Sequence, residues 1–130
     1  MKHCVRILGL ALPLLAPLAC RAGEVIAHPS VTLSAAEVRE VFLGEKQLAG
    51  ETKIVPVDNL SAQPEFAARV LQIELPKYGS LWIKKAFREG LTAPSAKAND
   101  AEVAAFVRST PGAVGYVSVA PPGSRVLMKF

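Results

Sequence analysis

The chain has 130 residues, of which 51% are hydrophobic and 20% are charged, with 15 Lys and Arg residues against 11 Asp and Glu residues. This length suits one domain rather than two, and the charged and apolar fractions exclude a disordered or collagen-like chain. The net charge of +4 and the pI near 9.3 indicate a nucleic-acid or membrane-surface protein only if the basic residues belong to the folded domain.

The first 22 residues have the three parts of a secretory signal peptide. Lys2 and Arg6 precede a run of uncharged, mostly apolar residues that is too short for a membrane-spanning helix, which needs about 20 residues. Small residues follow, so we predict cleavage after Ala22 and a periplasmic or secreted protein. One alternative is a lipoprotein anchored at Cys20, although Pro17 stands where that motif usually has Leu; an uncleaved anchor is the other.

Removal of residues 1–22 changes both the charge and the cysteine content. This segment holds three of the 15 basic residues, no acidic residue and both cysteines, Cys4 and Cys20, so residues 23–130 carry a net charge of +1 and no thiol. We therefore expect no nucleic-acid partner, no disulfide and no cysteine nucleophile. Residues 23–130 are predicted to form a single domain, which is long enough to fold on a hydrophobic core.

The first part of this domain predicts a strand, a helix and a strand. Residues 24–28 are apolar enough for a short strand. Ser34 and Glu37 have the spacing of a capping box, which opens a helix, and Gly44 ends it. The β-branched run at 53–57 predicts a second strand that is covered on both faces.

Three more helices are predicted before the next buried strand. The second helix of the domain follows residue 61 and ends at Pro76, and a fourth helix opens at Asn99. The third runs from about Tyr78 to Glu89. The side chains that its spacing is expected to turn toward the core are Trp82, Ile83, Ala86 and Phe87.

The remaining segments complete the predicted fold. Residues 91–98 are small and polar, which indicates a surface loop, and residues 113–119 and 125–130 read as strands. The order of elements predicts an α/β domain. Because helical crossovers join parallel strands, we expect a mostly parallel sheet flanked by helices.

Several short segments, far apart in the chain, form a recognisable set. They are Leu33-Ser34, Val41-Phe42-Leu43-Gly44, Trp82, Phe87, Gly90 and Thr110-Pro111-Gly112-Ala113-Val114-Gly115-Tyr116-Val117. The set resembles the second lobe of the phosphate-type periplasmic substrate-binding proteins, over roughly residues 24–119. This resemblance implies a single lobe of a type II periplasmic binding protein, in a small relative of phosphate-transporter components.

The resemblance also implies a ligand loop after the strand at 53–57. Full-length phosphate binders carry an Arg-Ser-Asp-Gly-Ser-Gly-Thr type segment there, and this chain lacks the arginine. The candidate ligand-binding residues at these positions are Asn59, Ser61, Ala62 and Gln63. Amides and hydroxyls at a helix N-terminus can hold an anion, but Asn or Ser there can also be a simple helix cap. Asp58 would repel an anion, and Pro64 removes one amide donor.

Residues that could support catalysis are few. His28 is the one histidine after the leader, and a lone histidine makes neither a metal site nor a catalytic triad. We therefore expect no catalytic residues, no metal and no cofactor. Lys84, Lys85 and Arg88 form a basic face that is either solvated or a patch for a partner.

Two functions remain open from the sequence. The first is an exported module like a substrate-binding protein of phosphate transport, which binds phosphate or another oxyanion weakly. A single lobe supplies only one wall, so a membrane transporter, a sensor protein or a second copy in a homodimer would complete its site. The second is a non-catalytic protein-interaction module without a small-molecule ligand, for which an exposed apolar patch would be the structural sign.

Overall fold

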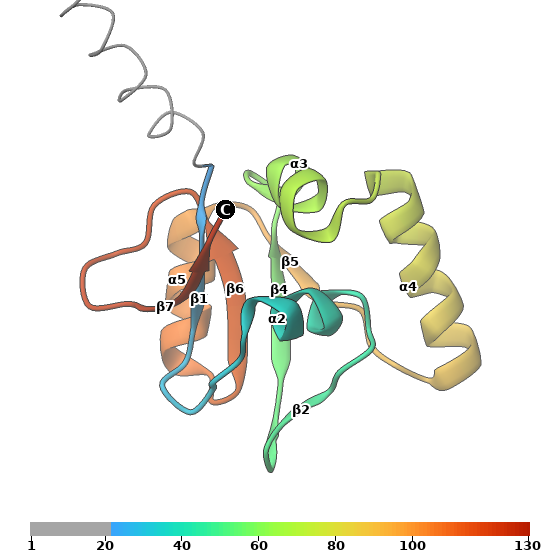
Figure 1. The fold of residues 1–130 in the computed structure, drawn as a ribbon, viewed down its shortest axis with the longest axis horizontal. Helices are drawn as coiled ribbons and strands as arrows, with labels where there is room; N and C mark the ends of the chain where they lie inside the picture. Colours follow the sequence, from blue (N-terminus) through green and yellow to red (C-terminus); the bar gives the residue numbers. More distant parts are fainter. Residues whose placement is uncertain (1–21) are drawn as a thin grey trace, which may run out of the picture.

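The computed structural model describes residues 22–130. The predicted leader and the alternative lipidation of Cys20 lie outside these residues. The described chain forms a five-stranded sheet with helices on both faces (Figure 1). Within residues 22–130, no helix combines the length and the apolar character that crossing a membrane requires.

The strands of this sheet come from both ends and the middle of the chain. They are β1 (Glu24–Ala27), β4 (Val55–Asn59), β5 (Ser95–Lys97), β6 (Ala113–Val117) and β7 (Arg125–Lys129). Their order across the sheet is β5-β4-β6-β1-β7. Two short strands, β2 (Leu48–Ala49) and β3 (Thr52–Lys53), form a separate hairpin.

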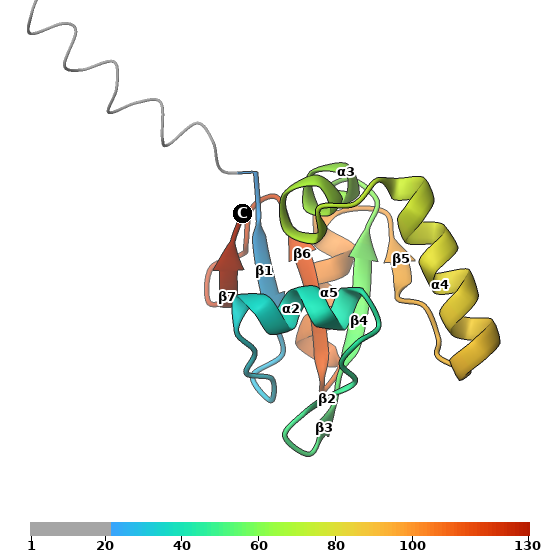
Figure 2. The same cartoon turned by 45° about the vertical axis from the view of Figure 1, so that its right-hand side comes forward.

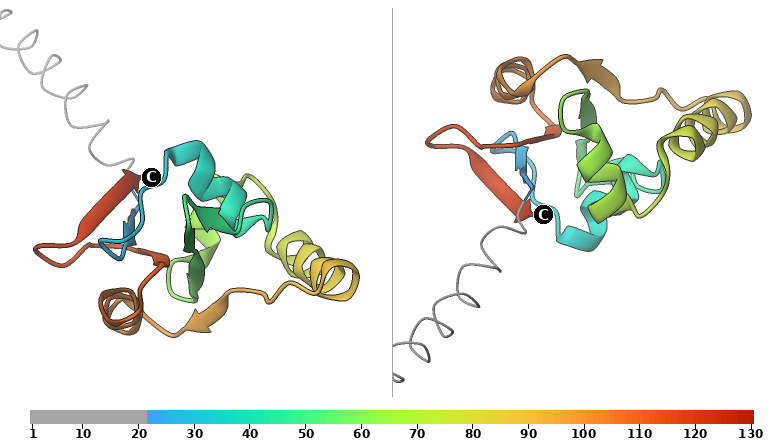
Figure 3. Two further views of the ribbon diagram at one scale, coloured as in Figure 1. Left: turned by 90° about the horizontal axis from the view of Figure 1, so that it is seen from below. Right: turned by 90° about the horizontal axis from the view of Figure 1, so that it is seen from above.

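The helices lie in two layers around the sheet. They are α2 (Ala35–Phe42), α3 (Gln63–Phe66), the π-helix η2 (Ala67–Leu71), α4 (Leu75–Glu89) and α5 (Asp100–Ser109). Figures 2 and 3 show α2 on one face of the sheet and α5 on the other, with α4 as the outermost helix beyond the β5 side.

The expected α/β class is confirmed, but the expectation of a mostly parallel sheet is wrong. Strand β4 pairs in parallel with β5 and β6, whereas β1 pairs antiparallel with β6 and β7. The sheet is therefore mixed. Helical crossovers do join the three parallel strands, but the β2–β3 hairpin adds a reversal of the chain between β1 and β4, in a segment that reads as a polar loop.

Local capping signals in the sequence are confirmed. The Ser34 amide donates to Glu37 Oε1 at 2.9 Å, and the Glu37 amide donates to Ser34 Oγ at 3.2 Å, which completes the capping box. Asn99 Oδ1 accepts from the Glu102 amide at 3.0 Å and caps α5. Gly90 ends α4 with a left-handed backbone, φ +68°.

Three segments differ from the prediction. Residues 91–98 are not entirely loop, because β5 lies within them and extends the sheet beside β4. Pro76 does not end a helix; it lies in the first turn of α4, where its missing amide hydrogen costs nothing. The helix before it is split into α3 and η2, and Gln72 ends η2 at φ +57°.

The largest difference concerns the side chains that α4 buries. Tyr78 and Trp82 are buried, but Ile83 is 72% exposed and Phe87 is 90% exposed, and Ala86 is exposed as well. The prediction that Ile83, Ala86 and Phe87 face the core is wrong. Helix α4 has two apolar stripes, and only the one with Tyr78 and Trp82 meets the body of the domain.

The sheet divides the core into two parts by alternation of its side chains. Val25 and Ala27 of β1 pack with the α2 side, together with Tyr116 of β6. Ile26 and Val117 pack with α5 on the other side. Apolar side chains make up most of both parts, so packing on both faces of the sheet stabilises the domain.

Gly115 in β6 provides a test of this packing. A Cβ at this position would lie 2.7 Å from both Val103 Cγ1 and Val57 Cγ1. We expect Gly115→Ala to lower the melting temperature by roughly 4 °C or more, because overpacking a core costs about 1–3 kcal/mol. Thermal unfolding followed by circular dichroism measures the change.

Gly79→Ala in α4 is the matched control for Gly115→Ala. A Cβ at Gly79 meets no heavy atom within 4 Å, and alanine favours a helix over glycine by about 0.5–1 kcal/mol. This variant should melt slightly higher than the wild type. Equal melting temperatures for the two variants would contradict the packing of β6 against α5.

Candidate functional site

The carboxyl ends of the parallel strands β5, β4 and β6 meet at one edge of the sheet. Chain connections leave β4 toward β5 and then return to β6 on its other side, so a topological switch point lies between β4 and β6. Ligands of α/β sheets bind at such a point, outside the carboxyl ends of the strands. Asn59 ends β4 here, and α5 begins nearby.

Asn59 is completely buried at this edge and uses its whole amide for internal bonds. Its Nδ2 donates to Asp100 Oδ1 at 2.8 Å and to the Tyr116 carbonyl at 3.0 Å. Its Oδ1 accepts from the Ser61 amide at 3.0 Å and the Ser61 hydroxyl at 2.7 Å. Asn59 therefore links β4, β6 and α5 and has no free group for a ligand.

The carboxylate of Asp100 occupies the place where an anion would bind. Its Oδ2 accepts from the backbone amides of Ser118 and Val119 at 3.0 and 3.3 Å, while its Oδ1 accepts from Asn59. These donors lie at the ends of β4 and β6, and Asp100 itself is the first residue of α5. A helix N-terminus is a position that attracts anions. The protein thus supplies its own anion at the switch point.

The other predicted ligand residues are near Asn59 but form no anion cradle. Ser61 is exposed and gives its hydroxyl to Asn59, so neither of these side chains caps α3. Ala62 takes the cap position without a side-chain hydrogen bond, and Gln63 begins a helix of only four residues. These residues are neighbours because they are consecutive in the chain. Their side chains do not point hydrogen-bond donors at a common position where an anion could bind.

Asp58, next to Asn59, is a buried carboxylate that is turned into the core. Tyr116 donates its hydroxyl to Asp58 Oδ1 at 2.8 Å, and Tyr78 donates to Oδ2 at 3.0 Å. Burial raises the pKa of Asp58 from 3.8 to about 6, and these two hydrogen bonds oppose the rise. Burial and the Asp58 charge raise the pKa of both tyrosines, so both hydroxyls remain donors.

Asp58 thus connects three elements. Tyr78 comes from the first turns of α4 and Tyr116 from β6, while Asp58 itself belongs to β4. Among residues 22–130, no buried side-chain nitrogen or oxygen atom lacks a hydrogen-bond partner. The hydrogen bonds of Asp58 thus join α4 to the sheet.

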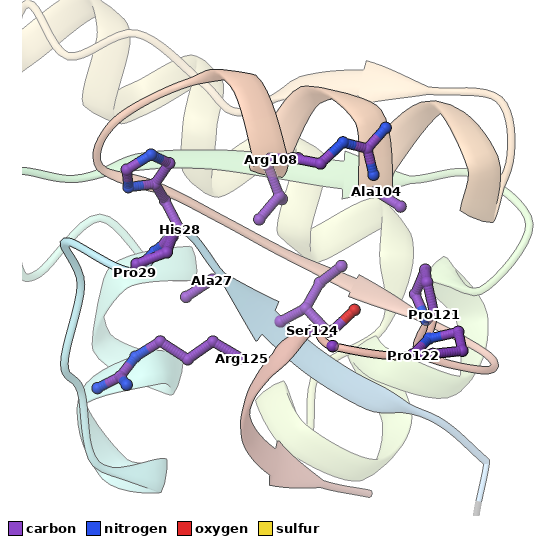
Figure 4. Close-up of a pocket in the computed structure, with 12 residues that line it drawn as sticks. Ala27, His28, Pro29, Ala104, Arg108, Pro121, Pro122, Ser124 and Arg125 are labelled. Atoms are coloured by element: carbon purple, nitrogen blue, oxygen red, sulfur yellow. The ribbon is translucent and has the colours of Figure 1, made fainter.

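The groove in Figure 4 lies between α5 and the turn that precedes β7. It has a volume of about 250 Å³, and most of its lining is apolar. Arg125 lies on its wall but donates to the Val31 carbonyl and the Thr32 hydroxyl at 2.8 and 2.7 Å. His28 Nδ1 is 2.8 Å from the Ser30 hydroxyl, which keeps this ring at the strand end. The same hydroxyl also accepts from the Gly112 amide at 3.0 Å, so this pair connects β1 to the turn before β6.

Among residues 22–130, the exposed large apolar side chains that lie on helices are Ile83 and Phe87, both on the outer face of α4. We use that name for Lys77, Ile83, Lys84, Phe87 and Arg88. Ile83 and Phe87 are four residues apart, so they lie one turn apart on the same side. The sequence predicts both side chains in the core, and the structure shows both in solvent. The signal for this difference is that α4 has two apolar stripes, and one helix cannot bury both against the same sheet.

No known family model and no curated protein matches this chain. The resemblance to phosphate-type binding proteins therefore stays a prediction. Within the described residues, no group of three or more His, Cys, Asp and Glu side chains is placed to hold a metal ion.

The buried Asp58 predicts an unusual pH dependence of stability. Its pKa is higher in the folded protein than its ordinary value of 3.8, so the folded state binds the proton more tightly. The stabilisation is complete below about pH 4 and is lost as the pH rises through about 6. The pKa difference corresponds to about 3 kcal/mol of unfolding free energy.

Asp58→Asn removes the titrating group and keeps the side-chain shape. We expect the unfolding free energy of the wild type, relative to this variant, to fall between about pH 4 and pH 7. Urea unfolding at several pH values measures it. A difference between the two proteins that does not change with pH would mean that Asp58 does not titrate in the core.

Proposed function

We propose that this protein is a non-catalytic interaction module that binds its partner through the outer face of α4. The observation that carries the proposal is the 90% exposure of Phe87 together with the 72% exposure of Ile83. Single exposed apolar residues are common, but adjacent large ones on a protruding element mark interaction surfaces. Burying each of these side chains would contribute about 1.5–3 kcal/mol.

The remaining contacts of α4 hold this face outward. Trp82 Nε1 donates to the Phe42 carbonyl at 3.0 Å, and Lys85 Nζ donates to the Gly44 carbonyl at 3.4 Å. With the Tyr78–Asp58 bond, these contacts anchor one side of the helix along much of its length. A helix fixed in this way presents Ile83 and Phe87 without a large ordering cost on binding.

A phosphate or oxyanion receptor is less well supported by the geometry. The Ser118 and Val119 amides already donate to Asp100, and Asn59 and Ser61 bond to each other. An added anion would have to displace or repel the Asp100 carboxylate. The remaining attraction of one helix terminus is about 0.3–1 kcal/mol when exposed, far below the roughly 8 kcal/mol of micromolar binding.

Asp100 therefore gives a direct test of the receptor hypothesis. We expect inorganic phosphate in the millimolar range to leave the melting temperature of the wild type unchanged. Asp100→Ala should melt at a lower temperature, because it frees these backbone amides, and phosphate should restore part of the loss. A phosphate-dependent rise in the wild type would instead support an oxyanion receptor.

Site-specific photo-cross-linking tests the interaction function in the cells that make the protein. Benzoylphenylalanine replaces Phe87 in one variant and Leu48 in a control, because Leu48 is also apolar and 52% exposed but lies on β2. We expect a discrete adduct from position 87 and none from position 48. No adduct at position 87, or the same adducts at both positions, would contradict the proposed function.

A further inference from the structure

The outer face of α4 carries a row of cations as well as its apolar pair. Lys77, Lys84 and Arg88 are separated by seven and four residues, so they line up along one flank of the helix. All three are exposed. Within residues 22–130, none of the three makes a hydrogen bond or ion pair, so their charges are available to a partner.

Helix α4 itself contributes no acidic side chain to this face. The one acidic residue of α4 is Glu89, and its carboxylate pairs with Lys85 Nζ at 3.4 Å. Lys85 also donates to the Gly44 carbonyl, so this pair belongs to the side that meets the body of the domain. Glu74, the N-cap residue, lies three positions before Lys77 but forms no ion pair with it. The outer face therefore combines two large apolar side chains with three cations that form no ion pair within residues 22–130.

We infer that the outer face of α4 docks the protein onto an anionic lipid surface. Phe87 and Ile83 would enter the interface between headgroups and acyl chains, and Lys77, Lys84 and Arg88 would lie next to the lipid phosphates. Helices that lie on membranes have this combination of aromatic and aliphatic side chains flanked by Lys and Arg. The inference rests on the proposed function, for which it names the partner.

The shape of the surface favours lipid over protein. Helix α4 is the outermost helix of the fold (Figures 1 and 3). Its apolar pair is largely in solvent, because Ile83 is 72% and Phe87 is 90% exposed. A protein partner would need a groove matched to these two side chains, whereas a lipid interface accepts a projecting apolar ridge of any shape. A second copy is disfavoured, because pairing two such faces would bring like charges together.

Vesicle binding tests the inference with the full chain, purified as the cell processes it. Partition onto vesicles of equal parts phosphatidylglycerol and phosphatidylcholine is compared with partition onto phosphatidylcholine alone, at low and high salt. We expect stronger binding to the anionic vesicles, and salt should weaken it because it screens the attraction. Equal binding to both vesicle types, or none, would overturn the inference.

Surface variants assign the binding to α4. Phe87→Ser should lower the partition coefficient by about tenfold or more, because it removes a buried aromatic side chain. Lys84→Gln and Arg88→Gln should each lower it by about fivefold. Leu48→Ser and Lys129→Gln, at exposed positions on other elements, should leave it unchanged. Wild-type binding by Phe87→Ser would overturn the inference, and unchanged melting temperatures verify that each variant is folded.

The cross-linking experiment separates failure of this inference from failure of the proposed function. A lipid adduct from position 87 supports both. A protein adduct from position 87, without binding to anionic vesicles, overturns the lipid inference and leaves the interaction function in place. No adduct above that of position 48, together with no vesicle binding, overturns both.

Discussion

The buried carboxylate of Asp58 determines where α4 lies. The position of α4 in turn determines which of its side chains are exposed to solvent. A charge in an apolar core must be hydrogen-bonded, and here the bonds come from the hydroxyls of Tyr116 and Tyr78. Tyr116 belongs to the sheet, but Tyr78 belongs to α4, so satisfying Asp58 draws the first turns of this helix onto the core. Trp82, one turn further, then bonds to the Phe42 carbonyl. The opposite stripe of α4 is left in solvent.

Polar groups are also hydrogen-bonded to one another at the sheet edge where α/β proteins usually bind a ligand. Asp100 takes the Ser118 and Val119 amides, and Asn59 shares its amide among Asp100, Tyr116 and Ser61. These bonds stabilise the junction of β4, β6 and α5 without leaving donors for a solute. The internal hydrogen bonds at the sheet edge and the exposed apolar side chains on α4 together support the proposed binding surface on this helix.

Much of the fold could be predicted from the sequence, because local signals decide it. Ser34, Glu37 and Asn99 cap helices through partners three residues away, and β-branched runs mark the buried strands. The rest depends on distant partners. The residues of β5 are small or polar and have no strand pattern of their own. They form a strand because they pair with β4. Tyr78 and Tyr116 are 20 and 58 residues from Asp58, so no local pattern shows which stripe of α4 is buried.

Hydroxyl-radical footprinting of the protein with anionic vesicles tests the central claim most directly. Phe87 and Ile83 report on α4, and Leu60 and Val119, 55% and 73% exposed, report on the carboxyl edge of the sheet. Mass spectrometry gives the labelling of each residue with and without phosphatidylglycerol vesicles. The account predicts that binding protects Phe87 and Ile83 and leaves Leu60 and Val119 unchanged. Protection of Leu60 and Val119 with full labelling of Phe87 would contradict it.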